Sequence, residues 1–133
     1  MLKTIEFFEF KEQIEVFREF MMASLPTMKE QSQDIDFLLN LGELFTLVAY
    51  GQLILENKKI YGIEDDLIDQ IFDFMVRDMS KFALTIYGKP ITSEKQQELC
   101  LKMLRRPVVN QTRYVRIYKD YVLSLVDTYK MND

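Results

Sequence analysis

Residues that break helices are rare in this chain and stand at only a few points. The 133 residues include 4 glycines and 3 prolines, and a protein built from many short strands and tight turns needs more of both. Between these points run long stretches in which apolar residues recur every three or four positions, which is the spacing of an amphipathic helix. The sequence therefore predicts an all-α fold.

Breakers and capping residues divide the chain into five predicted helices. These lie at about residues 2–24, 34–59, 64–87, 93–106 and 110–129. Asp34 and Asn110 are predicted N-caps, and Ser93 with Gln96 has the spacing of a capping box. Short connections between helices of unequal length predict an antiparallel helical bundle of four to five helices, and residues 1–133 are expected to form a single helical domain.

The second predicted helix is apolar nearly all round. It carries no charge from Leu44 to Leu55, and a helix of this kind is usually the buried centre of a bundle. The uncharged stretch is too short to cross a bilayer, so no membrane span is expected. Gly42 and Gly51 are expected to mark close approaches of neighbouring helices.

Several kinds of chemistry lack their usual residues. The chain has no histidine, which is the commonest general base and the usual imidazole ligand of metals. Asp66, Asp69 and Asp73 share one face of the third predicted helix, but a di-iron bundle also needs Glu-x-x-His pairs. These aspartates are therefore interpreted as a solvated acidic face, and no catalytic, cofactor-binding or metal-binding residue is assigned.

The one cysteine, Cys100, lies on the apolar stripe of the fourth predicted helix. It is predicted to be a buried structural residue, because a reactive thiol needs an exposed, electropositive setting. A single unpaired cysteine and an N-terminus without the pattern of a signal peptide favour a cytoplasmic location.

Charge is divided unevenly along the chain. Residues 1–78 hold 16 acidic and 7 basic side chains, whereas residues 89–119 hold 8 basic and 2 acidic ones. A basic stretch within an acidic chain is interpreted as complementing the chain's own acidic face or a neighbouring domain. The net charge of −4 argues against a nucleic-acid partner.

Four arginines of the basic stretch form the most suggestive cluster for a site. Arg105, Arg106, Arg113 and Arg116 lie around the predicted helix start at Asn110. Arginines beside a helix N-terminus could hold phosphate groups, such as those of CoA. The cluster is therefore an anion-binding candidate as well as a candidate docking surface.

The second half of the chain also carries a family resemblance. Residues 72–84 (FDFMVRDMSKFAL), 88–90 (GKP) and 100–109 (CLKMLRRPVV) resemble the C-terminal extension of a group of bacterial acyl-CoA dehydrogenases, as does the closing YKMND. The resemblance covers about residues 40–133, and residues 1–35 share only its helical character.

The resemblance implies a parent flavoenzyme that oxidises acyl-CoA to enoyl-CoA. In that family the catalytic core binds FAD, a glutamate of the core takes the α proton, and the flavin accepts the hydride. No residue here matches that glutamate, and no β-rich segment of the core is present. The chain is thus expected to be an accessory domain, holding no cofactor itself, that packs against the catalytic core or joins copies in a homo-oligomer. The alternatives are a helical protein-interaction module and a bundle that binds CoA phosphates.

Overall fold

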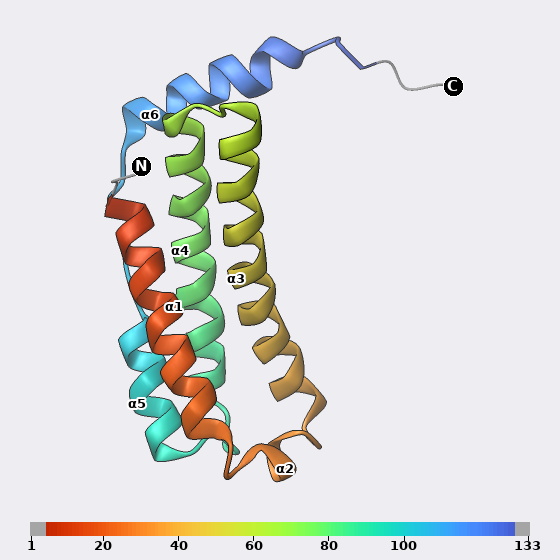
Figure 1. The fold of residues 1–133 in the computed structure, drawn as a ribbon, viewed down its shortest axis with the longest axis vertical. Helices are drawn as coiled ribbons and strands as arrows, with labels where there is room; N and C mark the ends of the chain where they lie inside the picture. The colour runs from red at the N-terminus through yellow and green to blue at the C-terminus, as the bar shows by residue number, and fades with distance from the viewer. Residues whose placement is uncertain (1–4, 130–133) are drawn as a thin grey trace.

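The computed structural model describes residues 5–129, and this part of the chain is helical with no strand (Figure 1). The helices are α1 (Ile5–Ser24), α2 (Met28–Gln31), α3 (Ile35–Tyr61), α4 (Asp65–Tyr87), α5 (Glu94–Met103) and α6 (Gln111–Ile117). A π-helical turn, Tyr118–Val122, and a 3-10 turn, Leu123–Leu125, follow α6. The all-α prediction is confirmed.

α4 lies at the centre of the bundle. It packs against α1, α3 and α5, while α6 crosses its N-terminal end, and α1 also packs along α5 (Figure 1). The largest fully buried side chains include Phe10, Phe20, Phe37 and Phe72. Burying a side chain of this size contributes roughly 1.5–3 kcal/mol, so these four rings are major contributors to the core.

The predicted caps are present. The side chain of Asp34 accepts a hydrogen bond from the Phe37 backbone N–H, and Asn110 accepts one from Arg113. Ser93 and Gln96 form the reciprocal bonds of a capping box. Gly62 ends α3 in the left-handed conformation with φ 62°, which glycine adopts without steric cost. Local sequence therefore sets where these helices begin and end.

Two short segments differ from the prediction. Residues 25–33 lie between the first two predicted helices, and within them Met28–Gln31 forms a single helical turn with Gln31 buried. The last predicted helix, 110–129, is regular only over Gln111–Ile117, and its buried residues are Arg113 and Ile117. Tertiary hydrogen bonds to Gln31 and ion pairs to Arg113 account for both changes.

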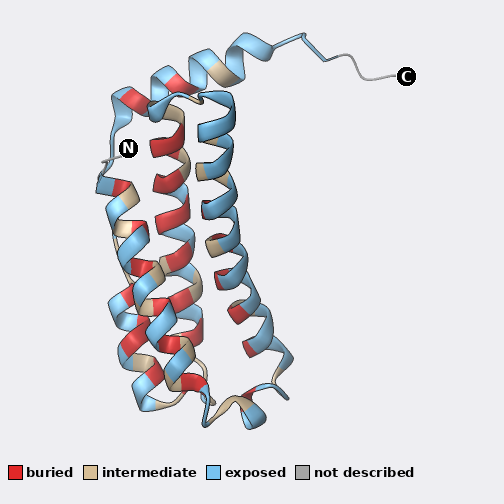
Figure 2. Cartoon of the chain, viewed as in Figure 1, coloured by how far each residue is buried: buried red, intermediate tan, exposed pale blue. Residues whose placement is uncertain are grey.

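α3 is not the buried centre of the bundle, which corrects the prediction. It packs on α4 along one side, which includes Phe37, Leu41 and Leu44, and its opposite side is exposed (Figure 2). Among the described residues it is the one helix long and apolar enough, by length and composition alone, to cross a membrane. Because α3 is apolar nearly all round, its sequence alone did not determine its place in the bundle.

The two glycines of α3 differ in their surroundings. A Cβ at Gly51 would lie 2.5 Å from Cε1 of Phe10. The close contact at Gly51 is therefore made by the Phe10 ring of α1 and not by the two helices, which an open groove separates. A Cβ at Gly42 would meet nothing within 4 Å. The prediction of a close approach is therefore wrong for Gly42 within a single chain.

The solvated acidic face on α4 is also wrong for two of its three aspartates. Asp69 and Asp73 are only 8% and 2% exposed. Both lie at the end of α4 that α6 crosses. Glu6 of α1 is buried as well.

Candidate functional site

The four arginines of the predicted cluster do not converge on one site. Arg105 pairs with Glu9 and Glu12 of α1, at 3.7 and 3.0 Å, and Arg116 pairs with Asp66 of α4. Arg113 is buried against α1 and α4, and Arg106 is exposed. A phosphate would have to compete with carboxylates for three of these side chains, so the geometry does not favour an anion site here.

Arg113 is the centre of a buried ion cluster that joins three helices. Its Nη1 lies 3.5 Å from Oε1 of Glu6 on α1, and its Nη2 lies 3.4 Å from Oδ2 of Asp73 on α4. Its Nε donates to Oε1 of Gln70 at 3.1 Å. Arg77 donates to the other oxygen of Asp73 at 2.6 Å. Since the charges offset one another, the cluster fastens α6 to the bundle.

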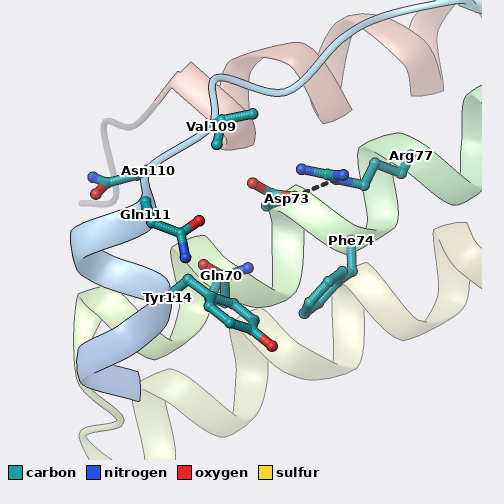
Figure 3. A pocket seen from close by; sticks show the side chains of 8 residues that line it. All are labelled: Gln70, Asp73, Phe74, Arg77, Val109, Asn110, Gln111 and Tyr114. Atoms are coloured by element: carbon teal, nitrogen blue, oxygen red, sulfur yellow. Dashed lines mark hydrogen bonds and ion pairs between the residues drawn. The ribbon is translucent and has the colours of Figure 1, made fainter. Parts of the chain in front are cut away.

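A small cleft lies beside this cluster, with a volume of about 170 Å³. Figure 3 shows its lining residues, which are Gln70, Asp73, Phe74, Arg77, Val109, Asn110, Gln111 and Tyr114. Pockets for drug-sized ligands and cofactors span roughly 300–1,000 Å³, so the cleft is too small for CoA. Its acid, Asp73, is already held by two arginines.

Other buried polar groups hold the helices together. Nε2 of Gln13 donates to the carbonyl oxygens of Val76 and Met103, at 3.1 and 2.9 Å. At the other end of the bundle, Gln31 and Gln96 donate to each other's amide oxygens at 2.6 and 2.9 Å. Each bond links segments far apart in sequence.

Cys100 is fully buried, as predicted. Burial disfavours the thiolate and raises the pKa of this thiol to about 12. A thiol with so little thiolate character at neutral pH is a poor nucleophile. Among residues 5–129 there is also no group of three or more acidic or cysteine side chains placed to hold a metal ion.

An open groove runs between α1 and α3. It has a volume of about 460 Å³ and is lined by apolar residues that include Phe7, Ile14, Val48 and Leu55. Lys11 and Glu15 stand at its α1 side. Because lysine and glutamate border it together, the charges select no particular ligand.

The largest feature that the sequence analysis missed is the outward side of α3. Six residues at spacings of three or four positions form what we call the outer seam: Ile35, Leu39, Gly42, Thr46, Tyr50 and Leu53. All are exposed, and the four large side chains, Ile35, Leu39, Tyr50 and Leu53, are 73%, 64%, 56% and 52% exposed. The sequence contained a sign of this surface, because α3 carries a second apolar stripe opposite the stripe that packs on α4.

The segment after α6, residues 118–129, is a second exposed apolar region, which we call the arm. It runs across the end of the bundle and projects past α3 (Figure 1). Tyr121 fastens it to the α3–α4 loop by donating to Oε2 of Glu64 at 2.9 Å. Val122, Leu125 and Val126 of the arm are exposed.

No family model, curated protein or solved structure matches this chain. The resemblance to acyl-CoA dehydrogenases therefore depends on the residues quoted for it.

Proposed function

We propose that the chain is a non-catalytic packing module, which docks against another folded protein surface through the outer seam of α3. The observation that carries the proposal is the exposure of this seam along the longest helix of the bundle. Contiguous apolar patches of this kind on a soluble protein usually mark an interaction site.

The chemistry of the described residues is consistent with this role. The arginines that could attract an anion are mostly occupied by carboxylates of α1 and α4, and the cysteine is buried with a raised pKa. The buried amides and ion pairs connect helices to one another. The polar groups thus make a rigid scaffold, and the apolar seam is the feature left for a partner.

Two partners follow from the sequence and the geometry. The resemblance implies the catalytic core of a flavin-dependent acyl-CoA dehydrogenase, for which this domain would serve interdomain packing. A second copy of the chain could also be the partner, because the apolar face of one α3 can pack against the same face of another. In either case the parent activity, the oxidation of acyl-CoA to enoyl-CoA, would belong to the core and its FAD.

A double substitution on the seam tests the proposal. Leu39→Glu with Leu53→Glu places two charges on the docking face, whereas Leu84→Glu changes an exposed leucine of α4 and serves as the matched control. Calorimetric titration with a separately produced dehydrogenase core, together with sedimentation of the chain alone, measures both kinds of association. We expect the double variant to weaken the association at least tenfold and the control to retain it.

Two results would contradict the proposal. One is a wild-type chain that neither binds the core nor associates with itself, even at a concentration 100-fold above the one at which the assay would detect a micromolar complex. The other is a purified chain that shows a flavin spectrum and oxidises acyl-CoA, because the residues described here would then be part of a complete active site.

A further inference from the structure

We propose that the surface seated on α3 is α3 of a second copy, packed antiparallel about a two-fold axis that passes near Thr46. This inference rests on the proposed packing function and names its partner.

The first support is the pattern of the seam itself. Helices that pack side by side place residues in contact at alternating steps of three and four. The side of α3 that faces the rest of the bundle follows this rule, with Phe37, Leu41, Leu44, Val48, Gly51 and Leu55. The outer seam follows the same rule on the opposite side, and within residues 5–129 all six of its residues remain exposed. α3 therefore has two helix-packing seams, of which one is used.

The second support is Gly42. A glycine within a helix costs roughly 0.5–1 kcal/mol relative to alanine, and no neighbour within 4 Å of a Cβ at this position requires its small size. A two-fold axis near Thr46 places Gly42 opposite Tyr50 of the second copy and Leu39 opposite Leu53. The tyrosine ring would occupy the space that Gly42 leaves, so one axis accounts for four residues of the seam.

The third support is the exposure of the large side chains of the seam. Ile35, Leu39, Tyr50 and Leu53 are each more than half exposed, and large apolar side chains left uncovered along one face are typical of an interaction surface. A dimer through the outer seam would cover these side chains.

The fourth support is charge. None of the six seam residues is charged, and from Leu44 to Leu55 α3 has no charged residue, although Asp36 and Glu43 flank the N-terminal half of the seam. The middle and C-terminal part of the seam is therefore best covered by another apolar face. The chain supplies such a face itself. A two-fold interface uses the same patch on both subunits, which is the commonest arrangement in homo-oligomers.

The test combines sedimentation equilibrium with cross-linking of the full chain. Wild type is expected to sediment as a dimer at micromolar concentration. Gly42→Leu fills space that is open in the single chain but closed by Tyr50 in the dimer, so it should raise the dissociation constant at least tenfold. Leu101→Glu, on the exposed side of α5, is the control that leaves the dimer intact. Circular dichroism verifies that each variant keeps the helical fold.

Thr46→Cys locates the axis. Two cysteines beside the axis face each other, so mild oxidation should give a disulfide-linked dimer in high yield. The control variant, Leu84→Cys, should give no such dimer. The native Cys100 does not interfere because it is buried.

Three results would overturn the inference. They are a wild-type chain that stays monomeric at 100 μM, a dimer that Gly42→Leu leaves unchanged, and Thr46→Cys that forms no cross-link. A monomer that binds the dehydrogenase core through the seam would leave the packing function standing and refute the second copy. A monomer that floats with phosphatidylcholine vesicles and binds no protein would refute both.

Discussion

At the scale of single residues, the main finding is that charge decides the position of α6. Arg113 comes from a stretch that looked like a surface for anions, yet it is 5% exposed and contacts Glu6, Gln70 and Asp73. Its partners lie at least 40 positions away in sequence. No local pattern could reveal that pairing, although the uneven division of acidic and basic residues along the chain indicated that pairs would form.

Arg113→Ala should therefore destabilise the fold strongly. Removing the guanidinium leaves Glu6 and Asp73 buried without their partner, and breaking a buried pair in this way costs about 3–5 kcal/mol. Arg116→Ala removes a half-exposed pair with Asp66 and should cost about 1 kcal/mol or less. Urea unfolding followed by circular dichroism compares the two, and equal losses would show that the cluster is not the anchor of α6.

The two glycines of α3 should respond to alanine in opposite directions. Gly51→Ala places a methyl group 2.5 Å from Cε1 of the buried Phe10, and such overpacking costs typically about 1–3 kcal/mol. Gly42→Ala adds a methyl group in open space and should stabilise the helix by roughly 0.5–1 kcal/mol. Unfolding at dilution low enough for monomers measures both, and a stabilising Gly51→Ala would mean that Phe10 moves freely.

The buried thiol makes stability depend on alkaline pH. The pKa of Cys100 is raised from 9.0 to about 12 by burial, so the folded state binds its proton more tightly than the unfolded state does. The contribution of the neutral thiol to the free energy of unfolding is therefore fully present below pH 9. It is lost as the pH rises toward 12, because the buried thiol then ionises. At pH 8 a thiol reagent should label Cys100 only in urea, whereas rapid labelling of the folded protein would show that the residue is accessible.

At the scale of elements, helix ends follow local sequence and helix positions do not. The N-cap at Asp34, the capping box at Ser93 and the left-handed Gly62 involve residues within a few positions of one another. The position of α3 at the edge of the bundle depends on contacts with α4. A helix that is apolar on every side can lie at the centre of a bundle. It can equally lie at the edge, if a partner covers its outer side.

Asp34→Ala should show the contribution of one cap. The substitution removes the acceptor for the Phe37 N–H, and loss of an N-cap costs about 0.5–2 kcal/mol. Asp34→Asn keeps an acceptor oxygen and should retain most of the stability. Thermal unfolding of both variants checks this, and an Asn variant as unstable as the Ala variant would indicate that charge, rather than the hydrogen bond, matters.

At the scale of the whole molecule, the bundle and the arm are separable. The buried residues of α6 are Arg113 and Ile117, and the segments Tyr118–Val122 and Leu123–Leu125 contain none. The arm nevertheless exposes Val122, Leu125 and Val126, and it projects past α3 (Figure 1). In an antiparallel dimer it would point toward the second copy.

Ending the chain after Ile117 tests this separation. We expect the free energy of unfolding of the monomer to change by about 1 kcal/mol or less, because the removed Tyr121–Glu64 hydrogen bond is exposed. Self-association should weaken, as measured by sedimentation. A truncated chain that unfolds would show instead that the arm is part of the core.

The sequence alone determined the helical class, the starts of α3, α5 and α6 and the burial of Cys100, because breakers, caps and apolar spacing act over a few residues. Some of its site predictions, such as the solvated aspartates and the buried α3, failed where packing between distant segments matters. Only the tertiary structure decided that Asp69, Asp73 and Arg113 are buried and that one seam of α3 is left uncovered. The physical reason is that burial belongs to pairs of surfaces, and a periodic stripe specifies that a face should be covered without specifying what covers it.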